Sequence, residues 1–515
     1  MKPWISALGV GVILVAGGGG YYIAHQKAEE ALKIVTLKIR ESLGPTGSFK
    51  YHSSSTSLWS HSVHLDDVEL ITKTQMKVHM DSLDVKPSGQ NAIDDFVGKN
   101  IHMYRDNEPK NINIASLTLH DVTMAPDAVQ KDDQGNWKIH PDKFTVGKWD
   151  IENIVLSIGD QQYYSLAHWE GKNYGLGKLT DTYMKDIRIN SLNKNDNKDN
   201  KKTNSATIAQ MSMRNVDLAS FYQGIDQKQV HFAEFFKIPE NTTKNITIDG
   251  IVLLDETKKP FAQLKQASLN FTAINKTDIK CKTHIDNLIL DLSDNESLKQ
   301  TLQTDNTRLD MSFDQDSYFT ADKNKIDTWN GKITVKDWFE VNYSTTRSGF
   351  WIQDAIDSLD LLYQLKNSNS YEMRDKYLEA LINKKEKRDA LLVSGKVNYQ
   401  DLGMINKIFD IISKKAGSQS EDMKNYFVAT MPFYANMVKA NDQNLGNKFE
   451  QYLQALGKVI KDPSRNLTIE LNPKKPISMD KTIEQIGQLQ SNYDYSKLNA
   501  FLDDLGVTVQ AGQPH

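Results

Sequence analysis

The stretch Val63 to Leu70, VHLDDVEL, carries the pattern that decides the fold of this chain. Apolar residues stand at positions 1, 3, 6 and 8 of the stretch, and polar residues fill the rest. Side chains of a β-strand alternate between its two faces, so strict alternation would put positions 6 and 8 on the face opposite to positions 1 and 3. Positions 4 and 5 must therefore absorb one residue if all four apolar side chains are to share a face.

The same pattern recurs along the chain, which indicates a repeated β-structure. Residues at positions 4 and 5 are largely turn formers, so we expect either a β-bulge or a tight hairpin loop there. Asp249-Gly250 in particular predicts a positive φ at Gly250, in a type I′ hairpin or a G1-type bulge. The copies are Val63, Leu65, Val68, Leu70; Val78, Met80, Leu83, Val85; Ile112, Ile114, Leu117, Leu119; Trp149, Ile151, Ile154, Leu156; Met211, Met213, Val216, Leu218; Ile246, Ile248, Ile251, Leu253; and, more weakly, Thr283, Ile285, Leu288, Leu290.

Residues 49–345 are therefore predicted to form a large, curved antiparallel β-sheet with repeated bulged strands or hairpins and one apolar face. The run 193–204, NKNDNKDNKKTN, has no apolar residue and is predicted to be a solvated loop. Such an apolar face must be covered by protein or by lipid. The candidate apolar groove consists of Val63, Leu65, Val68, Leu70, Ile112, Ile114, Leu117, Leu119, Ile246, Ile248, Ile251 and Leu253.

Residues 350–475 change to a helical period, with short strands predicted at 391–399 and 466–471, and residues 476–515 are predicted to form a C-terminal helix and tail. The fold class is therefore α+β. Pro432 should kink or split one of the helices. The helical stripes are Ile352, Ile356, Leu359, Tyr363; Leu402, Ile405, Phe409, Ile412, which Gly417 can cap; Met423 to about Lys439; and Leu445, Phe449, Tyr452, Leu456, Val459 before Pro463.

The N-terminal segment 1–25 is predicted to be a transmembrane anchor. Trp4 to Ala24, WISALGVGVILVAGGGGYYIA, contains no charged residue and is long enough to cross a hydrocarbon core of ~30 Å. A cleaved signal peptide is the alternative, since Met1-Lys2 is a short positive n-region and small residues follow the apolar run. A short tail before a large body favours export of the body. Residues 26–44 are predicted to form a stalk helix with Leu32, Val35, Ile39 and Leu43 on one face, ended by Gly44 and Pro45.

Composition excludes several classes of protein. A net charge of −4 argues against a nucleic-acid partner, because nucleic-acid binding rests on a basic field. The single cysteine, Cys281, allows no intrachain disulfide and no thiolate metal cluster. In addition, Cys281 and His284 are three apart in a predicted strand, so they should face opposite sides and not act together.

No motif predicts catalysis, a metal or a cofactor. GKNYGLGKLT, 171–180, departs from a phosphate-binding loop at two constrained positions and is interpreted as a glycine-rich turn. Asp314 and Asp316 begin like an EF-hand loop, but Tyr318 and Phe319 stand where an oxygen ligand and a glycine are needed. His61 and His64 are three apart in a predicted strand and should not share a metal. We therefore expect a protein that is not an enzyme.

The anchor, the stalk, Gly47-Ser-Phe-Lys-Tyr51, Leu58-Trp59, the stretch Val63 to Leu70 and the many short amphipathic strands together resemble bacterial envelope proteins of the YdgA and AsmA-like type. The resemblance covers about residues 1–345. It implies a single-pass inner-membrane anchor, a periplasmic body and, for the AsmA-like branch, a curved sheet with an apolar groove linked to lipid transport or envelope maintenance. Phospholipid, the membrane and other envelope proteins would then be the partners.

Two further functions compete with this one. The sheet could instead be a sealed core in a structural or interaction protein that binds partners through its loops, or the chain could be an unrecognised hydrolase. An open apolar face would favour the lipid-binding function, and a face covered by helices would favour the interaction protein.

Overall fold

The structure is a computed structural model of the chain. It describes residues 32, 36, 47–57, 62–72, 75–89, 92–106, 108–125, 128–131, 137–140, 143–158, 161–190, 205–219, 239–255, 257–275, 278–293, 308–320, 326–348, 391–478 and 495–514. The chain divides into two compact units. Unit 1 comprises Met1–Lys237 and Thr243–Pro260, and unit 2 comprises Ile238–Thr242 and Phe261–His515.

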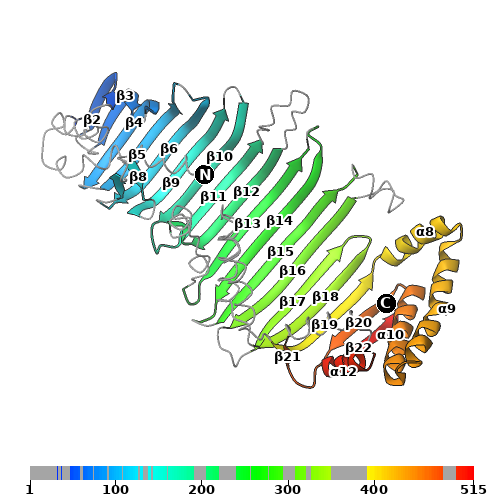
Figure 1. The fold of residues 1–515 in the computed structure, drawn as a ribbon. Coiled ribbons are helices and arrows are strands. Elements are labelled where there is room, and N and C mark those ends of the chain that lie inside the picture. The colour runs from blue at the N-terminus through cyan, green and yellow to red at the C-terminus, as the bar shows by residue number, and fades with distance from the viewer. Residues whose placement is uncertain are drawn as a thin grey trace. The chain divides into compact units, whose positions relative to one another are not determined.

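Unit 1 is built on an antiparallel meander, in which each long strand pairs with the next one along the chain (Figure 1). Two short strands, β1 and β2, both pair with β3 at the start of the meander, and β7 pairs with β8 in a separate hairpin. The strands are β1 (Ser48–Lys50), β2 (Ser53–Ser57), β3 (Ser62–Ile71), β4 (Lys77–Gly89), β5 (Ala92–Tyr104), β6 (Lys110–Met124), β7 (Val129–Lys131), β8 (Trp137–Ile139), β9 (Phe144–Ile158), β10 (Gln161–Tyr174), β11 (Thr180–Asn190), β12 (Ser205–Val216) and β13 (Thr243–Leu254).

A line of kinks crosses this meander at right angles to its strands. Every second strand carries one residue with a positive φ on this line, and these residues are Asp, Asn or Gly, which tolerate the left-handed conformation best. The strands between them present Asp81 or an alanine at the same level. The pairing register aligns the nine residues, which we call the kink row, in the order Asp67, Asp81, Asn100, Ala115, Asn153, Ala167, Asp186, Ala209 and Gly250.

The kink row explains the eight-residue sequence pattern on β3, β4, β6, β9 and β13. The copy from Met211 to Leu218 differs, because its kink at Asn215 lies outside the row, at a register shift that agrees with the predicted bulge, and Leu218 lies beyond the end of β12. Each strand crosses the row with two residues between its inner apolar positions, and the reversal there returns the outer apolar side chains to the same face. The hairpin alternative is wrong, because the strands run on through these residues. The bulge prediction also needs correction at the kink row, because paired strands have equal numbers of residues there and the register does not shift. Asn287 of unit 2 does lie at a register shift, between Ile285 and Leu288.

The core of unit 1 follows from the same alignment. Apolar side chains from neighbouring strands stand opposite one another and form straight rows, such as the row of Val68, Met80, Ile101, Ile114, Ile154, Leu166, Ile187, Ile208 and Ile251. Leu32, a helical residue of the predicted stalk, packs against this core.

Unit 2 contains a second antiparallel meander, followed by helices that pack beside its last strands (Figure 1). Its strands are β14 (Pro260–Ala273), β15 (Asp278–Asp291), β16 (Arg308–Thr320), β17 (Ile326–Val335), β18 (Phe339–Ser348), β19 (Leu391–Asp401), β20 (Arg465–Leu471), β21 (Ile477–Ser478) and β22 (Val507–Pro514). Its described helices are α8 (Met404–Ala416), α9 (Ser420–Lys439), α10 (Gln443–Lys461) and α12 (Tyr495–Leu505).

The C-terminal predictions are largely confirmed. Gly417 ends α8 with φ 65°, and the stripe from Leu445 to Val459 lies within α10. Pro432 does not split α9, in which the flanking Met431 and Ala435 are buried. The predicted strands at 391–399 and 466–471 are β19 and β20. The stripe from Ile352 to Tyr363 and the polar run 193–204 lie outside the described residues.

The coarse prediction of an antiparallel β-sheet followed by an α+β C-terminal part is confirmed. The predicted anchor, Trp4 to Ala24, lies outside the described residues. Among the described residues, no helix has both the length and the apolar character needed to cross a membrane.

Candidate functional site

The apolar face of unit 1 is sealed at one end of the meander. The eight predicted groove residues on β3 and β6 are between 0 and 9% exposed and belong to one packed cluster. A face buried to this degree is a protein core and has no room for a ligand. These eight residues are Val63, Leu65, Val68, Leu70, Ile112, Ile114, Leu117 and Leu119.

The same face is less covered at the other end of the meander. The four predicted groove residues on β13, Ile246, Ile248, Ile251 and Leu253, are half-buried. Along the apolar row through Ile251, burial is nearly complete as far as Ile187 of β11 and is only partial at Ile208 of β12. Ile189 at the end of β11 is 42% exposed. The apolar rows therefore continue beyond the sealed core.

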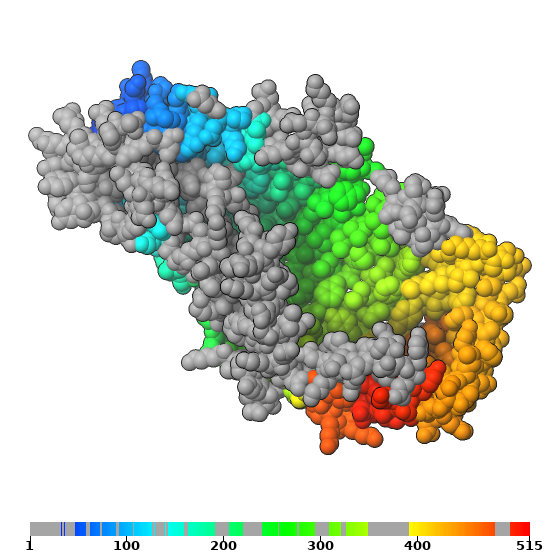
Figure 2. All heavy atoms as spheres, in the orientation of Figure 1, coloured from blue at the N-terminus to red at the C-terminus, as the bar shows by residue number. Residues whose placement is uncertain are grey.

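Unit 2 has an apolar face of its own. The register aligns Ile285, Phe313, Ile333 and Val341 in one row across β15 to β18. All four side chains are half-buried. Figure 2 shows the heavy atoms from the side of Figure 1, and strands of unit 2, coloured green to yellow-green, are visible at the surface there.

Glycines let large aromatic side chains lie across the sheets. Gly171 of β10 stands opposite Trp149 of β9, and a Cβ atom on Gly171 would lie 2.0 Å from Cζ2 of Trp149. Trp149 is 5% exposed and contacts the ring of Trp169 edge to face. Gly331 gives room to Tyr343 in unit 2 in the same way. Both pairs place an aromatic ring where the facing strand has no side chain.

The polar face of unit 1 carries pairs of histidine and carboxylate. His64 Nδ1 lies 2.7 Å from Asp84, and its Nε2 lies 2.9 Å from Asp66. The pKa of His64 is raised above its ordinary value, chiefly by the hydrogen bond with Asp84. Partial burial opposes this shift, and the hydrogen bond with Asp66 adds to it. His120 pairs with Asp95 in the same manner at 2.6 Å. These pairs join neighbouring strands and require no ligand.

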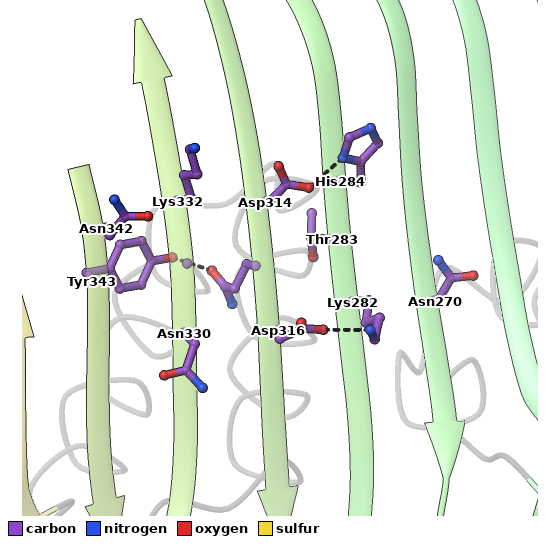
Figure 3. A pocket seen from close by; sticks show the side chains of 12 residues that line it. Asn270, Lys282, Thr283, His284, Asp314, Asp316, Asn330, Lys332, Asn342 and Tyr343 are labelled. Atoms are coloured by element: carbon purple, nitrogen blue, oxygen red, sulfur yellow. Dashed lines mark hydrogen bonds and ion pairs between the residues drawn. The ribbon is translucent and has the colours of Figure 1, made fainter. Parts of the chain in front are cut away.

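A shallow trough of about 550 Å³ lies on the sheet of unit 2 (Figure 3). Two polar rows border it, and each crosses four strands in register. Some of these side chains already pair with one another. His284 Nδ1 lies 2.6 Å from Asp314, and Lys282 Nζ lies 3.3 Å from Asp316. The rows are Asn270, Lys282, Asp316, Asn330 and His284, Asp314, Lys332, Asn342. This trough offers amides and balanced charges but no nucleophile with an activating base.

Two buried carboxylates lie where β15, β16 and β17 meet. Thr320 donates its backbone N–H to Asp327 at 2.8 Å and its hydroxyl to Asp278 at 2.7 Å. Burial raises the pKa of Asp327 to about 6, against the opposing effects of the Thr320 hydrogen bond and of Arg347. The Arg347 guanidinium stacks 3.8 Å from the ring centre of Trp329. This group is an internal polar cluster of the sheet.

The motifs singled out in the sequence take the structural roles expected of them. The glycine-rich run 171–180 forms the end of β10 and the turn into β11, with Gly177 at φ 71°. Asp314 and Asp316 lie in the middle of β16 instead of a calcium loop. Cys281 is buried, and burial raises the pKa of its thiol, which makes it a poor nucleophile. His61 lies outside the described residues.

Sequence reasoning missed the convergence of polar groups on the sheet faces. Among the described residues, Asp150, Glu152 and His168 have donor atoms within 4.8 Å of one another and could hold a metal ion. The signal that could have found them is the alternation of acidic residues and histidine with apolar residues in 149–152 and 166–170. The two segments form one group of donors only because β9 pairs with β10.

Comparisons with known proteins add little to these observations. A family model described as "Uncharacterized protein" matches residues 332–512, which extend from β17 to β22 in unit 2. No curated protein matches the chain.

Proposed function

We propose that the chain is a membrane-anchored, non-enzymatic protein of the bacterial envelope that binds or helps transport lipid on the half-buried part of its apolar sheet face. Its body would lie in the periplasm, and its anchor, the segment Trp4 to Ala24, in the inner membrane. The resemblance to YdgA and AsmA-like proteins supports the location. The observation that carries the proposal is the continuation of the apolar rows past the sealed core to Ile251 and Leu253.

The energetics favour an apolar occupant on this part of the sheet. Apolar surface in contact with water costs ~25 cal/mol per Å², and acyl chains would remove that cost without needing hydrogen bonds. The strands themselves satisfy their backbone groups by pairing, so only side chains face the occupant. A lipid chain lying across the rows would meet Ile and Leu side chains from several strands.

The contact of Leu32 supports a body that is held near the membrane. Leu32 packs against the core of unit 1 and comes eight positions after Ala24, at the end of the predicted span. Even a fully extended chain of that length reaches at most ~28 Å. The part of unit 1 that Leu32 contacts would therefore stand close to the bilayer surface.

The test compares two substitutions on one strand. Ile251→Glu places a charge on the apolar face, and Thr247→Glu places the same charge on the polar face opposite Ser212. Full-length proteins purified in the same detergent would be extracted, and their bound phospholipid measured by mass spectrometry. We expect Ile251→Glu to lose at least four fifths of the lipid while Thr247→Glu keeps it. Equal lipid in both variants, with circular dichroism unchanged, would refute the proposal.

Orientation is tested separately. A reporter enzyme that is active only in the export compartment, fused after His515, is expected to be active. Activity of a cytoplasmic reporter at the same position would refute the periplasmic location.

A structural or interaction protein with a sealed core and partner-binding loops is the alternative function. The near-complete burial of the eight groove residues on β3 and β6 favours it. It predicts that the purified protein carries no stoichiometric lipid and that Ile251→Glu lowers only its stability.

A further inference from the structure

Four donor side chains meet on the polar face of the hairpin formed by β9 and β10. Glu152 stands opposite His168, and two residues further along Asp150 stands opposite Glu170. Residues two apart on a strand share a face, so the four side chains form a compact patch. The apolar residues between them, Ile151 and Trp169, point to the other face and help fix the hairpin.

The distances within this patch differ from those of an ordinary histidine–carboxylate pair. His168 Nδ1 lies 2.8 Å from Glu152 and 3.7 Å from Asp150, while its Nε2 lies 3.6 Å from Glu170. One ring nitrogen carries at most one hydrogen, so Nδ1 can donate to only one of the two carboxylates beside it. At His64, by contrast, the two carboxylates lie at different ring nitrogens. A cation can satisfy all the groups that converge on Nδ1.

Among the residues that the structure describes, the lysines nearest to this patch do not fill this position. Lys172 lies 3.3 Å from Asp181 of β11. Lys148 faces Lys172 one step along the hairpin, and Lys185 of β11 faces His168. Lys185 is exposed, and a hydrated ammonium on a flexible side chain competes weakly with an ion that binds several donors directly.

We propose that Asp150, Glu152 and His168 bind a divalent transition-metal ion, with Glu170 placed beside Nε2 of His168 to accept the hydrogen of that ring nitrogen. The imidazole favours zinc and similar first-row transition metals over calcium or magnesium, which prefer oxygen ligands alone. Ligands bonded to one zinc ion at ~2.1 Å stand no more than ~4.2 Å apart, so donor atoms already within 4.8 Å need only small side-chain rotations. The ion would clamp β9 to β10 on the polar face of unit 1.

The test uses the full-length protein in detergent after removal of metal with a chelator. Zn²⁺ binding would be followed by calorimetry, and Co²⁺ binding by its visible absorption, which reports an imidazole and carboxylate environment. We expect one ion per chain. His168→Gln and Glu152→Gln should each weaken binding at least tenfold, and Zn²⁺ should raise the melting temperature of the unaltered protein but not that of the variants.

His284→Gln is the matched control, because His284 pairs with Asp314 at 2.6 Å on the sheet of unit 2 and should leave metal binding unchanged. Asp150→Asn provides a third variant in case His168→Gln disturbs the hairpin, which circular dichroism would reveal. Absence of saturable Zn²⁺ binding, or equal binding by His168→Gln and the unaltered protein, would overturn the proposal.

Discussion

Gly250 lies directly opposite Ala209 in the kink row, and a Cβ atom on Gly250 would lie 2.7 Å from the Cβ of Ala209. Gly250 also has φ 66°, which side chains disfavour. Two independent constraints therefore require glycine at this position. The facing strands carry alanine at three of their four kink-row positions, Ala115, Ala167 and Ala209, so a small side chain stands beside most of the kinked residues.

Gly250→Ala is expected to destabilise the protein by ~2 to 3 kcal/mol, through backbone strain and the close contact with Ala209. Gly177→Ala is the control, because Gly177 has φ 71° but a Cβ atom added to it would have no atom within 4 Å. It should cost only ~1 to 2 kcal/mol, the strain alone. Denaturant unfolding of both variants measures the difference, and equal losses would contradict the contact.

Gly171→Ala is expected to push Trp149 out of its place in the core and to destabilise unit 1 by ~1 to 3 kcal/mol, the usual cost of overpacking. A Cβ atom added to Gly171 would lie 2.0 Å from Trp149 Cζ2. Gly512→Ala, where the nearest atom would be 3.7 Å away, is the control and should leave the melting temperature nearly unchanged. A harmless Gly171→Ala would mean that Trp149 can lie elsewhere.

Asp327→Asn is expected to change how stability depends on pH. The pKa of Asp327 is about 6 in the folded protein and the ordinary value, 3.8, when unfolded, so the folded state holds the proton more tightly. The stability that protonation of Asp327 contributes is therefore fully present below pH 4 and is lost as the pH rises to about 6. Asn cannot ionise, yet it can still accept from the Thr320 N–H.

The melting temperature of Asp327→Asn relative to the unaltered protein should consequently rise between pH 4 and pH 6 and level off above. Thermal unfolding across this range measures it. A difference that stays constant with pH would show that Asp327 does not titrate there.

His64 should titrate above its ordinary pKa of 6.5, chiefly because of its hydrogen bond with Asp84. The stability that this pair contributes is present below pH 6.5 and is lost as the pH rises through the raised value. Asp84→Asn should lower the midpoint, measured by NMR on the His64 ring. Asp95→Asn, which alters the partner of His120, should leave it unchanged. If both substitutions have the same effect, the shift has another cause.

Local features of the fold could be predicted from sequence, and features that depend on distant pairing could not. The positions of the inward apolar residues, such as Val63 and Ile251, follow from a pattern within eight residues. The kink row depends on the register between strands, and nothing near Ala209 in the sequence marks Gly250 as its neighbour. For the same reason Glu152 and His168, sixteen residues apart, could not be combined into a candidate metal site.

The extent of the sealed core was also beyond sequence reasoning. Ile114 and Ile251 are both inner apolar residues of their copies of the pattern and stand in the same apolar row, yet Ile114 is 2% exposed and Ile251 is half-buried. Their difference depends on what packs over each end of the face. We expect Ile114→Glu to unfold unit 1, because a buried unpaired charge costs several kcal/mol. Ile251→Glu should leave unit 1 folded. Circular dichroism of the two variants distinguishes them.

The most direct test of lipid binding is photo-crosslinking within living bacteria. A photoreactive amino acid at Leu253 would lie on the apolar face of β13, and the same residue at Val252 would lie on the opposite face, since Leu253 pairs with Ala206 and Val252 with Thr207. Illumination followed by mass spectrometry of the β13 peptide identifies any attached acyl chain. We predict lipid adducts at Leu253 and at least tenfold fewer at Val252. Equal adducts at both positions, or none at Leu253, would contradict an acyl-binding apolar face.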